Sequence, residues 1–277
     1  MKTSSTETLT GAALDLRSPF LGQINRWLWR TSTFLLPWVA VVLVWTLIPY
    51  TGLVSPALVP SPAVVAAKFV RLMTENSLWI DILVSSQRVL TGLALGLAAA
   101  IPVAFGLGWY PPARRLVDPL VNFFRSLPPI ALIPLIIVYF GIDEVAKVVM
   151  LFYAAFFASV IVMYEGIVQT NPVFIRVART LGATDFQLFC RVIVPLSVPH
   201  MLTALRVALG VSWATLVAAE LVAAQRGLGA VIQNASNFFQ IDTIYVGIIC
   251  IGAVAVLMDS LVRVVAKRAV SWQERMA

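Results

Sequence analysis

Apolar residues along this chain gather into six long runs that are separated by more polar connections. A helix that crosses the hydrocarbon core of a membrane needs about 20 mostly apolar residues. The runs lie at roughly 34–54, 85–108, 127–141, 146–166, 200–223 and 243–265. The pattern therefore predicts an all-α membrane protein with six transmembrane helices.

The third run is short and contains the stretch SLPPIALIPL, residues 126–135. Three prolines in so few residues remove backbone donors and oppose a straight helix. We expect a kinked or partly unwound span there, which is tolerated where neighbouring helices or water satisfy the freed backbone groups. The connection 55–81 is expected to contain a short helix that lies along the membrane surface.

Composition supports the membrane assignment, because 60% of the residues are hydrophobic and only 12% are charged. Soluble domains contain about 45–50% apolar residues. The net charge of +7 comes from Lys and Arg residues scattered at the ends of the apolar runs. Without one basic face, the charge does not indicate nucleic-acid binding.

The distribution of Lys and Arg predicts the orientation of the six spans. Cytoplasmic connections carry an excess of these residues. With both termini in the cytoplasm, fourteen Lys and Arg residues lie inside and four lie outside, and Arg88 and Arg206 fall within spans.

This orientation gives a domain plan with both termini in the cytoplasm. We expect a cytoplasmic tail at 1–33, a first transmembrane helix and outer connection at 34–80, a transmembrane core at 81–266 with a cytoplasmic loop at 167–199, and a second tail at 267–277.

Several kinds of chemistry leave no trace in the sequence. The one histidine, His200, allows no histidine metal cluster, and we expect it to be an interfacial or packing residue. No glycine precedes any of the four lysines, so no phosphate-binding P-loop is present. Cys190 and Cys250 have no motif spacing and are expected to be unpaired packing residues. If ATP drives this protein, a separate partner must bind and hydrolyse it.

Four ionisable residues lie in or near the later spans, namely Glu165, Arg206, Glu220 and Asp259. Charged groups in a membrane are costly and often functional. Most lie within about two turns of an interface, which disfavours proton coupling. Arg206 and Glu220 either serve function or form pairs that hold the fifth span against its neighbours.

The connection 167–199 has the pattern of two short helices. Apolar residues at Phe174, Val177, Ala178 and Leu181 follow the spacing of one helical face. Asn171 before Pro172 is a typical helix start, and Gly182 is placed to end the helix in a left-handed conformation.

A second helix is predicted from Thr184, which has capping-box spacing to Gln187. This helix would carry Phe186 and Phe189 on one side, and Pro195 and Pro199 would end it before the fifth span. The apolar face either lies among lipid headgroups or docks into a groove of a soluble partner.

The spacing from Ala178 through Gly182 to the sequence VIVP at 192–195 resembles the signature E-A-A-x-x-x-G-x9-I-x-L-P of permease subunits of binding-protein-dependent ABC importers. The first positions depart from it, with Arg176 for glutamate and Val177 for alanine. Together with the stretches FRSLPPIALIPLIIVYFGIDEVAKV and GVSWATLVAAEL followed by RGLG, this pattern resembles the nitrate, sulfonate and taurine branch, and is most similar to taurine permeases.

The resemblance implies a type I ABC importer permease fold and a coupling helix in the loop 167–199. The residues implied to contact the ATPase are Arg176, Ala178, Arg179, Leu181, Gly182, Ala183, Thr184, Phe186 and Pro195. We expect the translocation pathway to include Ser212, Trp213, Thr215 and Glu220, although packing between helices explains the first three equally well.

The implied assembly is a permease homodimer in a bacterial inner membrane, with two cytoplasmic ATPase subunits that bind ATP and Mg and a periplasmic binding protein. The expected substrate is taurine or a related small sulfonate, with alkanesulfonate or nitrate as alternatives. A secondary carrier and a membrane-embedded enzyme are rival classes. A carrier would need charges near the midplane, and an enzyme acting on lipids would need a cluster of catalytic side chains.

Overall fold

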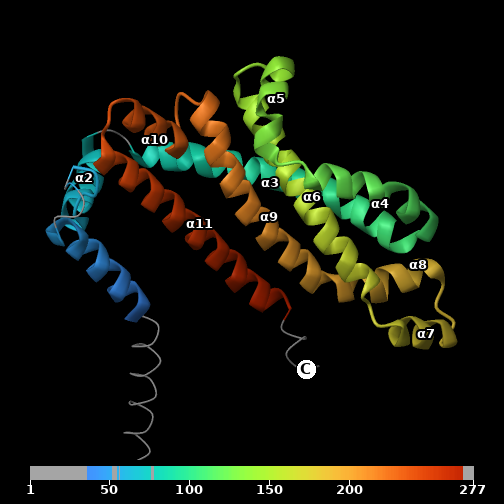
Figure 1. The fold of residues 1–277 in the computed structure, drawn as a ribbon. Helices are drawn as coiled ribbons and strands as arrows, with labels where there is room; N and C mark the ends of the chain where they lie inside the picture. The colour runs from blue at the N-terminus through green and yellow to red at the C-terminus, as the bar shows by residue number, and fades with distance from the viewer. Residues whose placement is uncertain (1–35, 52–54, 56, 76–77, 271–277) are drawn as a thin grey trace, which may run out of the picture. The chain divides into compact units, whose positions relative to one another are not determined.

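The computed structural model describes residues 36–51, 55, 57–75 and 78–270, and within these ranges every regular element is a helix (Figure 1). The expected tail at 1–33 and most of the tail at 267–277 lie outside the described residues. The chain divides into two compact units, Met1–Pro62 and Ala63–Ala277. In the first unit an apolar helix, Leu36–Leu47, leads into a 3-10 turn, Ile48–Thr51, and the indole Nε1 of Trp45 donates to the carbonyl of Pro60 at 3.0 Å.

The second unit contains the other elements in chain order. They are α2 (Pro62–Glu75), α3 (Leu78–Trp109), α4 (Pro111–Ser126), η2 (Pro129–Leu132), α5 (Ile133–Phe140), α6 (Glu144–Val168), α7 (Pro172–Thr180), α8 (Asp185–Leu188), η3 (Phe189–Ile193), α9 (Val194–Ala223), α10 (Leu228–Asn237) and α11 (Ile241–Ala269). The helix expected in the connection 55–81 is present as α2, where Lys68 pairs with Asp242 of α11 at 3.3 Å.

Helices α3, α6 and α9 form the centre of this unit, and small residues allow their close contact. A Cβ at Gly96 of α3 would lie 2.7 Å from the Cβ of Ala155 on α6, and Gly108 of α3 faces Ile167 of α6 in the same way. These pairs show that α3 and α6 run in the same direction. Gly166 of α6 packs against the ring of His200 near the start of α9, so α9 runs in the opposite direction. His200 is thus a packing residue, as expected.

The third apolar run begins at a sharp bend, and its first turn is the 3-10 turn η2 that leads into α5. Helix α4 and the segment Pro129–Phe140 meet at 86°, with Pro128 and Pro129 at the break. Helix α4 was not expected from the sequence, where its residues were assigned to a connection. Four described helices are long and apolar enough to span a membrane, or five if the bent pair is one span. The count of six therefore stays a prediction, because the first run is described only from Leu36 onward.

The expected end of the loop at Pro195 and Pro199 is wrong. A π-helical turn, Phe189–Ile193, joins α8 to α9 without a break, and its hydrogen bond runs from Val194 N to Phe189 O. Pro195 then lies in the first turn of α9, where a missing N–H does no harm. Pro199 lies inside α9 and is tolerated there.

Candidate functional sites at the two ends of the bundle

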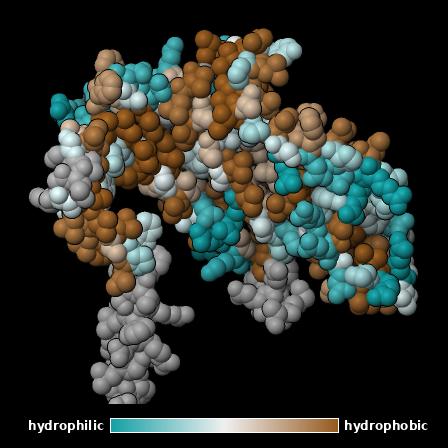
Figure 2. Space-filling model, in the orientation of Figure 1, coloured by the Kyte–Doolittle hydropathy of each residue, from teal (hydrophilic) through white to brown (hydrophobic). Residues whose placement is uncertain are grey.

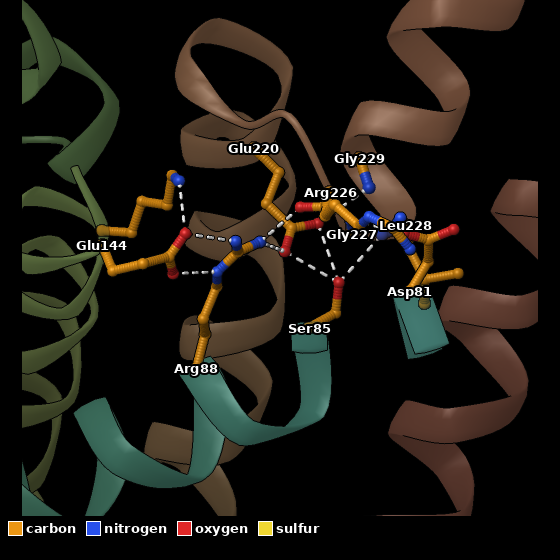
Figure 3. Close-up of polar contacts among 10 residues, drawn as sticks. Asp81, Ser85, Arg88, Glu144, Glu220, Arg226, Gly227, Leu228 and Gly229 are labelled. Carbon is orange, nitrogen blue, oxygen red and sulfur yellow. Dashed lines mark hydrogen bonds and ion pairs between the residues drawn. The ribbon is translucent and has the colours of Figure 1, made fainter. Parts of the chain in front are cut away.

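The opposite directions of α3 and α9 place two groups of polar residues at opposite ends of the bundle. One end holds the starts of α3 and α6 and the end of α9, and we call the side-chain cluster there the ion-pair network (Figure 3). The other end holds α7 and α8, which lie in the loop 167–199 that was expected to couple to an ATPase.

Glu220 is the centre of the ion-pair network, and its side chain is fully buried. Its carboxylate accepts from Ser85 Oγ at 2.7 and 2.9 Å, from Arg88 Nη1 at 2.6 Å and from the backbone N–H of Gly229 at 2.8 Å. A buried carboxylate without such donors would be strongly unfavourable. Charge neutralisation by Arg88 and three different donors explain why Glu220 is tolerated in an apolar helix.

Arg88 joins Glu220 to a second carboxylate at the start of α6. Its Nε and Nη2 donate to the two oxygens of Glu144 at 2.6 and 2.5 Å, which is a bidentate pair, and Lys147 adds a contact to Glu144 at 2.8 Å. The Glu144 side chain is 60% exposed, whereas Arg88 is 6% exposed. Arg88 therefore links the interior of the network to its surface, and connects three helices through one planar group.

The turn between α9 and α10 is held by side chains from other helices (Figure 3). The N–H groups of Gly227 and Leu228 donate to Asp81 Oδ1 at 3.0 Å and to Ser85 Oγ at 2.9 Å, and Arg88 Nη1 donates to the carbonyl of Arg226 at 2.7 Å. The first amides of a helix lack partners within that helix. Here α3 and α9 supply partners for the start of α10, so the turn is fixed to both helices.

Gly227 is required in this turn for two reasons. Its φ of +122° lies in a region that residues with a Cβ rarely adopt. A Cβ there would also run into the carboxylate of Glu220 and lie 2.7 Å from Arg88 Nη1. The glycine allows the backbone to approach the ion pair closely.

The other expected pathway residues lie within α9 and are buried. Among the described residues, the hydroxyl of Ser212 and the indole N–H of Trp213 have no hydrogen-bond partner, while Thr215 Oγ1 donates to the carbonyl of Val211 at 2.9 Å. Their role in a pathway stays a prediction. Of the four expected pathway residues, only Glu220 contacts other ionisable side chains in the described part of the chain.

Arg206 also forms a pair, but with α11. Its Nε lies 2.9 Å from Asp259 Oδ1, and Arg263 Nη2 lies 2.5 Å from Asp259 Oδ2. The expectation that Arg206 and Glu220 fix the fifth span against neighbours agrees with both contacts. Arg88, Ser85 and Glu144 were missed as partners, although an arginine within an apolar run was a signal that it needed a buried carboxylate.

At the opposite end, α7 has the caps that the sequence predicts. Asn171 Oδ1 accepts from Val173 N at 2.9 Å, and Pro172 is the first helical residue. The helix ends in a Schellman motif, with Ala183 N bonded to Ala178 O and Gly182 N bonded to Arg179 O, both at 3.0 Å. Gly182 has a φ of +78°, which is the left-handed conformation expected for it.

Helix α8 begins with the predicted capping box. Thr184 Oγ1 accepts from Gln187 N at 3.3 Å, and Gln187 Oε1 accepts from Thr184 N at 3.1 Å. Phe189 packs edge-on against Phe105 and Trp109 of α3, with ring centroids 5.4 and 5.7 Å apart. Phe186 instead is 76% exposed. The two aromatic rings therefore do not form one exposed ridge, which corrects the sequence-based expectation.

The loop nevertheless presents a large apolar surface. Leu181 is 82% exposed, and Phe174 and Val177 are also exposed, whereas Ala178 and Ala183 are half-buried. Arg176, Arg179, Thr184 and Pro195 are exposed around this surface, and Arg179 Nη2 lies 3.6 Å from Asp185 Oδ1. Figure 2 shows apolar surface beside hydrophilic surface at the end that carries α7 and α8. Of the nine residues expected to contact an ATPase, eight lie between Arg176 and Phe186, and Pro195 lies in the first turn of α9. Their contact with an ATPase stays a prediction.

Apolar spans, a buried ion-pair network and an exposed capped loop define a multi-pass membrane protein with a surface for a partner. Residues 92–271 match the family described as the binding-protein-dependent transport system inner membrane component. The chain belongs to this family of ABC importer permeases. It is a permease subunit and not an enzyme, and ATP hydrolysis belongs to separate ATPase subunits.

Three relatives place the chain more narrowly. It is 46% identical over 231 residues to a probable ABC transporter permease of Brucella abortus strain 2308, covering 83% of this chain and 91% of that protein. It is 34% identical to the taurine transport system permease of Escherichia coli K12, covering 89% and 93%. It is also 34% identical to the putative aliphatic sulfonates transport permease of the same organism, covering 85% and 89%. The nitrate, sulfonate and taurine branch is therefore confirmed.

The fold agrees with that of solved transporters. A chain of the MetNI methionine ABC transporter superposes with a TM-score of 0.57 at 19% identity, covering 70% of this chain and 96% of that chain. At this identity the likeness concerns the fold, which is that of a type I ABC importer permease.

Proposed function

We propose that this permease forms the translocation pathway for taurine or a related small sulfonate. The relative named as a taurine permease aligns over 256 residues, which supports the choice. An aliphatic sulfonate permease has the same identity of 34%, so the shared sulfonate group is the chemistry that both relatives have in common. Alkanesulfonate and nitrate are the alternative cargoes.

The loop 167–199, with its helices α7 and α8, forms the docking surface for a cytoplasmic ATPase. The observation that carries this proposal is an apolar surface on two short helices whose ends are fixed by capping hydrogen bonds. On this surface the side chains of Leu181 and Phe186 are 82% and 76% exposed. A helix that exposes apolar residues this way is suited to a groove in a soluble partner. The caps fix the direction of the surface, so movement of the ATPase is transmitted to α9 through the continuous turn Phe189–Ile193.

The assembly is a homodimer with two ATPase subunits, a binding protein on the outer side, and both termini in the cytoplasm of a bacterial inner membrane. The fourteen-to-four distribution of Lys and Arg supports this orientation. The orientation places the ion-pair network on the outer side and the loop in the cytoplasm. Closed symmetry is the usual outcome when one surface patch meets its own copy.

Docking is tested with Phe186→Asp in cells that also express the partner ATPase subunit. We expect the ATPase to be lost when the permease is purified, because the charge must enter the apolar groove. Phe238→Asp is the matched control, since Phe238 is 74% exposed and lies at the end of α10, on the side of the ion-pair network. ATPase retained with Phe186→Asp, or lost equally with both variants, would reject the docking surface.

The cargo is tested by uptake of labelled taurine, ethanesulfonate and nitrate into cells that depend on this transporter. Competition for binding to the partner binding protein should follow the same order. Taurine or ethanesulfonate should be taken up in preference to nitrate. A preference for nitrate would overturn the proposed substrate class without affecting the docking of the ATPase.

A further inference from the structure

Three charged side chains lie together within the apolar helices α9 and α11, in the first half of α9 and the second half of α11. Arg206 is 12 residues from the start of α9 and 17 from its end, and Asp259 is 18 residues from the start of α11 and 10 from its end. At 1.5 Å per residue, each lies about 15 Å or more from either helix end. Arg263 lies one turn from Asp259 on the same helix and contacts the same carboxylate.

These side chains are not enclosed by the chain that carries them. The exposed fractions are 40% for Arg206, 27% for Asp259 and 55% for Arg263. Charged groups within transmembrane helices seldom face lipid, and they usually face the interior of a bundle or a water-filled cavity. The network around Glu220 differs, because its central carboxylate is fully buried and already accepts from three donors, Ser85, Arg88 and Gly229.

The cluster carries one positive charge more than it balances. Two guanidinium groups share the single carboxylate of Asp259, which leaves an excess of +1. Arg206 Nε donates to Asp259 Oδ1 at 2.9 Å, and Arg206 Nη2 forms a longer contact with Asp259 Oδ2 at 3.5 Å. Because a guanidinium has five donors, both arginines keep donors that an oxyanion can accept.

The surface beside the cluster has room next to small side chains. Thr203, Arg206, Gly210 and Ala214 are exposed along one face of α9. A Cβ placed on Gly210 or on Gly252 of α11 would meet no atom within 4 Å. Figure 2 shows a hydrophilic patch over the C-terminal part of α11, bordered by apolar surface.

We propose that Arg206, Asp259 and Arg263 form an anion site within the translocation pathway, where the sulfonate group of the cargo is held briefly by the excess guanidinium charge. Asp259 holds both arginines in place and limits the net charge, so that the anion is attracted but not trapped. This proposal rests on the proposed function as a sulfonate permease. In a homodimer two such clusters would serve one pathway.

Accessibility is tested first, with Thr203→Cys one turn from Arg206 in a Cys190→Ser background. The remaining Cys250 is 5% exposed. Open membrane fragments are treated with the anionic 2-sulfonatoethyl or the cationic 2-trimethylammonioethyl methanethiosulfonate. We expect Thr203→Cys to react, faster with the anionic reagent. Leu257→Cys, on the face of α11 opposite Asp259, is the control and should not react. An unreactive Thr203→Cys would show that lipid or a second subunit covers this face, and would overturn the proposal.

Charge is tested next, by comparing two variants with different net charge. Arg263→Gln keeps the Arg206–Asp259 pair but removes the excess positive charge of the cluster. The double variant Arg206→Gln with Asp259→Asn removes the pair but keeps the net charge of +1 on Arg263. We expect Arg263→Gln to lower the ratio of anionic to cationic labelling, and labelled taurine uptake, by about threefold or more. The double variant should retain the ratio. Arg268→Gln, in the last turn of α11, is the matched control for loss of a cationic side chain.

The opposite result would assign the cluster a structural role. If the double variant lost stability and uptake while Arg263→Gln behaved as the unaltered protein, the arginines would serve only to join α9 and α11. The labelling ratio does not depend on which anion is transported. A failed cargo assignment and a failed anion site are therefore distinguishable.

Discussion

The guanidinium of Arg88 lies 2.6 Å from the carboxylate of Glu220, although 132 positions separate the two residues in the sequence. Both side chains are almost entirely buried. A buried pair of this kind adds little net stability compared with apolar packing, because both charges lose their hydration. Removal of one partner is a different matter, since the other charge then stays buried and unpaired.

Arg88→Met should therefore lower the free energy of unfolding by about 3–5 kcal/mol. The loss would appear as a lower thermal midpoint of the purified permease in detergent. Size-exclusion chromatography after heating measures the fraction that stays folded. Glu144→Gln removes the exposed partner of the same arginine and should cost about 1 kcal/mol or less. Equal effects of the two variants would contradict the distinction between the buried and the exposed pair.

Gly227→Ala should also destabilise the end of the bundle that holds the ion-pair network. The new methyl group must displace the Glu220 carboxylate in addition to adopting a φ of +122°. Gly141→Ala is the control, because Gly141 has a φ of +76° but a Cβ there meets nothing within 4 Å. Gly141 also has a ψ of −167°, a combination that is essentially restricted to glycine, and we expect the control to cost about 1–3 kcal/mol. Gly227→Ala should cost clearly more in the same thermal assay. Similar midpoints for both variants would argue against crowding of the ion pair.

Gly182→Asp should leave the bundle folded and disconnect ATP hydrolysis from uptake. The left-handed backbone adds about 1–2 kcal/mol for any residue with a Cβ. Within the chain a Cβ at Gly182 meets no atom within 4 Å, so the fold of the permease should not be disturbed by a clash. The loss of coupling should instead come from a clash of the new side chain with the docked ATPase. The measurement is ATPase activity and labelled taurine uptake in proteoliposomes that contain the complete transporter. Normal uptake at normal hydrolysis would reject the role of Gly182.

Two glycines of α3 should respond to alanine with opposite signs. Gly96→Ala places a methyl 2.7 Å from the Cβ of Ala155, so α3 and α6 must separate and the thermal midpoint should fall. Gly106→Ala meets nothing within 4 Å and should be neutral or stabilising, since alanine favours a helix by about 1 kcal/mol over glycine. A fall in the midpoint for Gly106→Ala alone would contradict the observed packing.

Local signals in the sequence predicted the loop well. The start of α7 at Asn171 and Pro172, the left-handed Gly182 and the capping box at Thr184 each depend on residues within a few positions of one another. Such interactions do not require knowledge of the tertiary structure. The prediction that Phe189 lies on the same side as Phe186 was wrong, because the position of Phe189 depends on its contacts with Phe105 and Trp109, which lie more than 75 positions earlier.

The ion-pair network shows the same limit. Glu220 was predicted as a functional or paired residue from its cost in an apolar helix, but the sequence does not show which cation faces it. The contact with Arg88 depends on the opposite directions of α3 and α9, which bring the start of α3 beside the end of α9.

The π-helical turn Phe189–Ile193 has a consequence for how the loop is aimed. Compared with an α-helix, a π turn holds one additional residue. Each residue of an α-helix turns the chain by about 100°. Without the additional residue, α8 would be rotated by that angle about the axis of α9, and Phe189 would leave its place between Phe105 and Trp109. The number of residues in this short turn therefore sets the direction in which α8 and its exposed side chains face around the axis of α9. That direction does not depend on which side chains α8 carries.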